Sequence, residues 1–316
     1  MSKTPQNEVT SVATAGNLVA RQRLTPVGRH INRPLGDGIR KLCAAWMAGL
    51  IMAGSAGAQT SVTSPNIIGF VKVDLPADQM QIIATPLNPA NSGTNNPAMT
   101  LDQILRTNKL TASYDSFSAD NVYLWTGAGY QSAWLTDDGW GGDGGPVWKW
   151  VYFDPASAVP ALCATNSAFD VKIGEALWLL HRTTTTTIYL TGEIPQAAVT
   201  TTTLDAGLTM IGNPYPVVQT LDQLIGTHIT GITASYDSFS ADNVYLWTGA
   251  GYRSAWLTDD GWGGDGGPIW KWVYFDPASP VPALCATNNL FTVTPGQGLW
   301  YNARGGAFSW PVARPY

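Results

Sequence analysis

Residues 111–166 read TASYDSFSADNVYLWTGAGYQSAWLTDDGWGGDGGPVWKWVYFDPASAVPALCATN, and residues 233–288 repeat this stretch with three changes. The changes are Gln131 to Arg253, Val147 to Ile269 and Ala158 to Pro280, all at an offset of 122 residues. A weaker likeness continues outside the stretch, as in residues 174–178 (GEALW) and 296–300 (GQGLW). This period is far longer than the roughly 20–50 residues of a solenoid unit. The sequence therefore predicts a duplicated domain.

Within each copy the residue pattern is mostly that of β-strands. Residues 121–125 (NVYLW) and 130–135 (YQSAWL) flank the segment TGAG, which is typical of a hairpin whose glycines supply positive φ in the turn. Residues 147–153 predict a third strand, with Trp148, Trp150 and Tyr152 on one face. Residues 176–180 and 186–191 predict a last pair of strands, joined by His181, Arg182 and a run of threonines.

One short helix per copy is predicted from a capping pattern. Thr100 precedes residues 101–106, and Gln103 stands three positions further on, as in a capping box. We therefore expect an all-β protein of two tandem homologous β-sheet or barrel-like domains, each with one short helix. The predicted boundaries are 59–195 for repeat 1 and 196–316 for repeat 2.

The start of the chain has the pattern of a secretory signal peptide. Arg40 and Lys41 precede an apolar run of about a dozen residues, which ends in the small residues Ala56, Gly57 and Ala58. We expect residues 1–58 to be removed, so that Gln59 becomes the N-terminus of an exported protein. The alternative is an N-terminal membrane anchor that is retained, but the run is shorter than the ~20 residues of a spanning helix. After residue 58 we expect no membrane span.

Charge and cysteine content narrow the function further. Residues 59–316 hold ten basic and twenty acidic residues, so nucleic acid is not an expected partner. Only Cys163 and Cys285 remain after residue 58, in identical PALCATN settings, which is far below the density of disulfide-stapled secreted domains. The interpretation that we favour is two buried, inert thiols, and the alternative is a disulfide between them.

A loop rich in Asp, Gly and Trp follows the predicted hairpin in each copy. Its carboxylates and indoles are the candidate ligand-binding residues, namely Asp137, Asp138, Trp140, Asp143, Asp259, Asp260, Trp262 and Asp265. Clustered Asp residues are hard oxygen ligands, so calcium is one interpretation, although the spacing fits no calcium motif that we recognise. The interpretation that we favour is a turn cluster without metal, and we expect no other cofactor.

Tryptophan is the second feature of these copies. Trp140 and Trp262 lie between Gly and Asp and are expected to be exposed, where an indole stacks on the apolar face of a sugar. The strand tryptophans are expected to fill a β core instead. Catalytic patterns are sparse, because the sequence holds no Gly-x-Ser-x-Gly elbow, no His-Glu-x-x-His and no phosphate loop. A glycosidase using Asp137 and Asp143 would need an acid with a raised pKa, which a Gly-rich loop does not provide.

Several short motifs resemble a known group of proteins. Residues 66–77 (NIIGFVKVDLPA), 82–88 (IIATPLN), 191–195 (TGEIP) and 295–300 (PGQGLW) are similar to motifs of secreted tandem-repeat β proteins of environmental bacteria. The resemblance implies the tandem β architecture and no particular activity. We therefore expect a secreted, non-enzymatic protein with a structural or adhesive role at the cell exterior. The alternative is a bivalent carbohydrate-binding protein that uses the Asp/Gly/Trp loops to bind polysaccharide or other cell-surface components.

Overall fold

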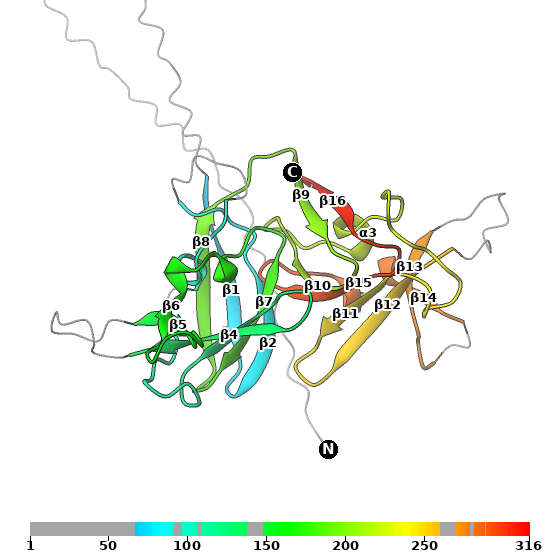
Figure 1. Ribbon diagram of the computed structural model, residues 1–316. Coiled ribbons are helices and arrows are strands. Elements are labelled where there is room, and N and C mark those ends of the chain that lie inside the picture. The colour runs from blue at the N-terminus through cyan, green and yellow to red at the C-terminus, as the bar shows by residue number, and fades with distance from the viewer. Residues whose placement is uncertain are drawn as a thin grey trace, which may run out of the picture. The chain divides into compact units, whose positions relative to one another are not determined.

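The computed structural model describes residues 67–90, 97–105, 109–137, 148–259, 270–278, 281–287 and 289–316 (Figure 1). The predicted signal peptide lies outside these residues. In repeat 1 the elements are β1 (Ile68–Leu75), β2 (Gln79–Ala84), α2 (Leu101–Ile104), β3 (Asn121–Trp125), β4 (Tyr130–Thr136), β5 (Lys149–Tyr152), β6 (Ala161–Leu162), η2 (Cys163–Thr165), η3 (Ser167–Phe169), β7 (Ala176–His181) and β8 (Thr186–Glu193). Repeat 2 contains β9 (Val199–Leu204), β10 (Gly207–Gly212), α3 (Leu221–Leu224), β11 (Asn243–Trp247), β12 (Tyr252–Thr258), β13 (Lys271–Tyr274), β14 (Ala283–Leu284), η4 (Cys285–Thr287), η5 (Asn289–Phe291), β15 (Gly298–Ala303) and β16 (Phe308–Ala313).

Each repeat builds the same two antiparallel sheets. Repeat 1 has a six-stranded sheet in the order β2-β7-β3-β4-β5-β6 and a two-stranded ribbon, β1-β8. Repeat 2 has the order β10-β15-β11-β12-β13-β14 and the ribbon β16-β9. The predicted all-β fold with two homologous units is thereby confirmed. The predicted boundary at Pro195 falls between β8 and β9.

The predicted hairpin and helix are present, whereas one predicted strand pair is wrong. β3 pairs with β4, and Gly127 in the turn has a φ of 88°. The backbone N–H of Thr100 donates to Oε1 of Gln103 at 2.9 Å, as a capping box requires. β7 and β8 do not pair with each other, because β7 lies between β2 and β3 while β8 pairs with β1. The chain leaves the large sheet after β7 in order to cover one face of it.

One face of each large sheet holds the core of its repeat. In repeat 1, Leu124, Leu135 and Trp150 pack with Val73 and Leu190 of the ribbon. The equivalent core of repeat 2 contains Trp272, Leu257 and Trp310 of its ribbon. The prediction that strand tryptophans fill the core is thus correct for Trp150 and Trp272, whose side chains are almost fully buried.

The opposite faces of the two sheets contact each other around an approximate two-fold relation. The backbone N–H of Ala84 donates to the carbonyl of Gly296 at 3.1 Å, and the equivalent N–H of Gly212 donates to the carbonyl of Gly174 at 3.0 Å. Close approach leaves room for only one methyl group at this position, because a Cβ on Gly212 would overlap that of Ala84. The same holds for Gly298, where a Cβ would lie 2.5 Å from that of its counterpart Ala176.

Candidate functional site

The structure describes only two of the eight loop residues predicted to bind a ligand. Asp137 and Asp259 are half-buried directly after β4 and β12. The other six, Asp138, Trp140, Asp143, Asp260, Trp262 and Asp265, lie outside the described residues. Among the residues that are described, no cluster of three His, Cys, Asp or Glu side chains is placed to hold a metal ion. The loop site and its calcium therefore remain predictions.

The two cysteines lie in separate cores. Cys163 belongs to the core of repeat 1 and Cys285 to that of repeat 2, and both thiols are free and buried. Burial raises the pKa of Cys163 to about 12 and that of Cys285 further, and nearby Asp102 and Asp222 add to the two shifts. Thiolate is thus scarce at neutral pH in both cores.

Aromatic side chains dominate the contact between the repeats. Tyr123 and Trp125 alternate with core residues along β3, so both point away from the core of repeat 1. Their copies, Tyr245 and Trp247, do the same on β11. Trp178 and Trp300, on the central strands β7 and β15, complete the set. The interface is therefore a belt of indole and phenol rings that packs around Ile82, Met210 and two alanines.

Two indole N–H groups fix this belt in equivalent ways. Nε1 of Trp125 donates to the carbonyl oxygen of Leu208 at 2.7 Å, and Nε1 of Trp247 donates to that of Met80 at 2.7 Å. Each hydrogen bond joins one repeat to the other. Trp125 also packs edge-to-face on Trp300, and Trp247 on Trp178, with centroids 5.5 Å apart in both pairs. The rings are thus held in fixed orientations before any ligand arrives.

On one side of the belt the rings surround an open groove of about 440 Å³. Its walls are contributed by both repeats and consist of Trp125, Tyr130, Leu208, Tyr245, Tyr252, Trp300 and Asn302. Tyr130 and Tyr252 are about half exposed, at 51% and 49%, whereas Trp300 at the base is buried. The groove lies within the ~300–1,000 Å³ typical of small-molecule sites.

The polar atoms of the groove are few. Burial raises the pKa of Tyr252, so its hydroxyl stays protonated at neutral pH and serves as donor or acceptor. Asn302 adds an amide to the wall. The position equivalent to Asn302 in repeat 1 is Leu180, since β7 and β15 correspond. The groove therefore has a polar residue, Asn302, at a position where the other repeat has the apolar Leu180.

The sequence alone did not identify this groove, because the strand tryptophans were expected to be core. The usable signal was the strict recurrence of Tyr-x-Trp at residues 123–125 and 245–247, together with Trp178 and Trp300. Alternation along a strand distinguishes two faces but does not say what the second face contacts.

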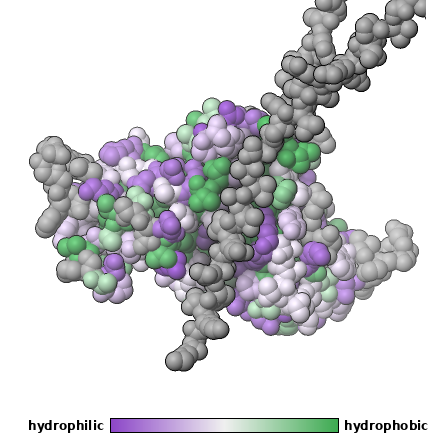
Figure 2. Space-filling view, turned by 180° about the vertical axis from the view of Figure 1, so that it is seen from behind, coloured by the Kyte–Doolittle hydropathy of each residue, from purple (hydrophilic) through white to green (hydrophobic). Residues whose placement is uncertain are grey.

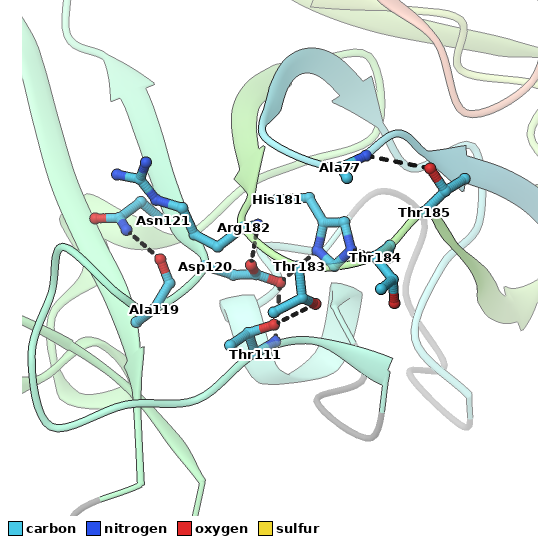
Figure 3. A network of polar contacts seen from close by, with 10 residues as sticks. All are labelled: Ala77, Thr111, Ala119, Asp120, Asn121, His181, Arg182, Thr183, Thr184 and Thr185. Atoms are coloured by element: carbon cyan, nitrogen blue, oxygen red, sulfur yellow. Dashed lines mark hydrogen bonds and ion pairs between the residues drawn. The ribbon is translucent and has the colours of Figure 1, made fainter.

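A buried polar network lies in repeat 1 at the end of β7 (Figure 3). Nδ1 of His181 lies 2.8 Å from a carboxylate oxygen of Asp120, and Nε2 lies 3.0 Å from the carbonyl oxygen of Thr184. Asp120 also accepts the backbone N–H groups of Thr111 and Arg182. Both side chains are essentially inaccessible, at 1% and 0% exposure, so the network holds the chain between β7 and β8 in place and reaches no ligand.

No helix of the described residues is long and apolar enough to cross a membrane. Comparison of the chain with protein-family models, with curated proteins and with solved structures finds no match.

Proposed function

We propose that this is an exported, non-enzymatic protein that binds a polysaccharide in the aromatic groove between its repeats. The observation that carries the proposal is the set of five aromatic rings converging on one open groove, two of them half exposed. The export part rests on the signal-like sequence of residues 1–58. The site differs from the two loop sites expected from the sequence, because both repeats contribute to a single groove.

The chemistry of the groove suits a neutral sugar chain. Aromatic rings offer flat apolar surface to the C–H faces of pyranose rings, and the few polar groups satisfy hydroxyls. Asn302 and the hydroxyls of Tyr130 and Tyr252 are the polar groups available here. Because the indoles of Trp125 and Trp300 are already fixed by contacts between the repeats, little side-chain entropy is lost on binding.

Substitution of the half-exposed tyrosines tests the proposal. Tyr130→Ala with Tyr252→Ala should weaken binding of a neutral oligosaccharide, such as cellohexaose or xylohexaose, by about tenfold or more. The reason is that stacking of a sugar on each aromatic ring contributes on the order of 1 kcal/mol. Binding is measured by calorimetry and by the shift of tryptophan fluorescence. Phe117→Ala with Phe239→Ala is the matched control, since these two aromatics are 82% exposed and lie outside the groove. Equal affinity of the groove variant and the control variant would refute the groove as the site.

A structural or adhesive role is the second candidate, and exposed aromatics favour it. Each repeat presents three such rings outside the groove, namely Tyr114, Phe117 and Phe153 and the copies Tyr236, Phe239 and Phe275, at 72–82% exposure. Figure 2 shows hydrophobic residues at several separate places on one face. The turn that carries Phe117 is fixed, because Asp115 accepts hydrogen bonds from the backbone of Phe117 and the hydroxyl of Ser118. If adhesion is the function, the Phe117 and Phe239 variant loses attachment to solid surfaces while the groove variant keeps it.

A further inference from the structure

A second cavity of about 440 Å³ lies where the β1–β2 turn of repeat 1 meets the β11–β12 hairpin of repeat 2. Leu246 and Arg253 line this cavity and are partners in the strand register, while Leu246 belongs to the core face. Adjacent residues of a strand point to opposite faces, so Arg253 and the groove residue Tyr252 lie on different faces of the sheet. The cavity and the aromatic groove are therefore separate sites.

Arg253 is a cationic group of this cavity without a carboxylate partner in the described part of the chain. Its Nη1 is 3.5 Å from the carbonyl oxygen of Leu290, and no carboxylate among the described residues lies within ion-pair distance of it. The acid of the cavity, Asp74, is already engaged. It accepts hydrogen bonds from Thr187 and from Lys72, the latter at 2.9 Å, and these contacts lower its pKa. Asp74 and Lys72 thus balance each other, and Arg253 retains its positive charge.

The two-fold counterpart of this cavity has the opposite charge. That counterpart, of about 320 Å³, has Gln131 in place of Arg253 and Glu175 in place of Gln297. Asp170 and Asp205 also line it, and none of the described residues that line it is Lys or Arg. Of the three differences within the 56-residue duplicated stretch, only the change from Gln131 to Arg253 alters the charge. The chain therefore contains the same cavity twice, once cationic and once anionic.

We propose that the cavity around Arg253 binds a carboxylate-bearing sugar, such as a uronic acid residue of an acidic polysaccharide. A guanidinium matches a carboxylate with two parallel hydrogen bonds. The remaining polar lining consists of uncharged groups, including the amides of Gln79 and Gln81, which suit sugar hydroxyls. Ile82 and Trp247 supply apolar wall. One charged group among several neutral donors and acceptors matches a ring with one carboxylate and several hydroxyls.

The test compares residues that the two copies exchange naturally. The protein lacking residues 1–58 is titrated calorimetrically with trigalacturonate at low salt, with cellotriose as the neutral counterpart. Arg253→Gln, which installs the residue of repeat 1, should weaken trigalacturonate binding by about tenfold or more, because a charge-assisted hydrogen-bond pair is lost. The double variant Arg253→Gln with Gln131→Arg keeps the net charge of the natural protein and should not restore binding at this cavity. Arg253→Gln should melt as the natural protein does, since position 253 is exposed.

Four results would overturn the inference. They are unchanged trigalacturonate affinity in Arg253→Gln, equal affinity for cellotriose, no trigalacturonate binding at millimolar concentration, and displacement of all binding by inorganic phosphate, which would indicate an adventitious ion only. The inference stands apart from the aromatic groove. Loss of cellohexaose binding in the tyrosine variant tests the groove alone and leaves the Arg253 result untouched.

Discussion

Asp120 and its copy Asp242 occupy equivalent buried positions but receive their side-chain hydrogen bond from different residues. Each accepts two equivalent backbone N–H groups, from Thr111 and Arg182 or from Thr233 and Arg304. In repeat 1 the further partner is His181, and in repeat 2 it is the hydroxyl of Tyr301 at 2.6 Å. Tyr301 stands two residues before the position equivalent to His181, so the donor has moved along β15 while staying on the same face.

This difference predicts unequal costs of removing the two donors. Nδ1 of His181 contacts the carboxylate of Asp120 and Nε2 contacts the carbonyl oxygen of Thr184, so both ring nitrogens are engaged in the buried network. His181→Ala removes a partner of a buried carboxylate and should lower the free energy of unfolding by about 3–5 kcal/mol. Tyr301→Phe removes one hydrogen bond to the equivalent carboxylate and leaves the ring in place, so it should lower the free energy of unfolding by about 1–3 kcal/mol. Urea denaturation of the two variants measures both values, and equal losses would contradict the expected difference between the two donors.

Comparison of the copies could not have found this exchange. His181 aligns with Ala303 and Tyr301 with Leu179, so each position considered alone shows a polar side chain in one repeat and an apolar one in the other. The carboxylate that both donors serve is repeated identically. The compensation exists only in space, through neighbouring positions on one face of one strand.

At the scale of elements, the strand pairing differs from the order of the strands along the chain. Nearest neighbours in sequence pair often, which favoured a pairing of residues 176–180 with residues 186–191. Ile188 and Leu190 instead face the core together with Val73 and Leu75 of β1. The large sheet needs a cover for its apolar face, and burial of that face outweighs the shorter loop. The hairpin β3–β4 was predictable because its turn chemistry is local.

The contact between β2 and β10 yields a prediction about a single methyl group. Gly212→Ala introduces a Cβ that overlaps the methyl of Ala84, so it should lower the free energy of unfolding by about 1–3 kcal/mol through overpacking. Ala84→Gly in the same molecule removes the opposing methyl and should recover most of the loss. Denaturation midpoints of the single and the double variant measure the recovery. A double variant as unstable as Gly212→Ala alone would show that the methyl overlap is not the cause.

At the scale of the whole molecule, the duplication and the all-β class were predictable, but the interface was not. Repetition is visible in the letters of the sequence, and alternation indicates strands with two faces. Neither states that the second face of one copy packs on the second face of the other. Residues 64–316 form one compact unit, and the predicted independence of the repeats remains a prediction.

The symmetry of the interface predicts what happens when the repeats are separated. Fragments 59–195 and 196–316 should each have the circular dichroism of β structure and should associate with each other when mixed, because each repeat donates one indole hydrogen bond to the other and the alanines of repeat 1 fit against the glycines of repeat 2. Sedimentation of the equimolar mixture at rising concentration should reveal a one-to-one complex. A mixture that stays monomeric would contradict the interface between the repeats, and fragments that do not fold would contradict the boundary at residue 195.

The interface has room for one methyl group at each Ala–Gly contact, and this limits how similar the sequences of the two repeats can become. Where Ala84 faces Gly212 and Ala176 faces Gly298, a perfect tandem copy of repeat 1 would place two methyl groups in space for one. A perfect copy of repeat 2 would leave a gap that no side chain fills. Recombination that homogenises the copies is thus tolerated over residues 111–166 and 233–288, where the match is nearly complete, and is penalised at the strands on either side. The nearly symmetric contact therefore requires strands that differ in sequence, with alanine on one side and glycine on the other.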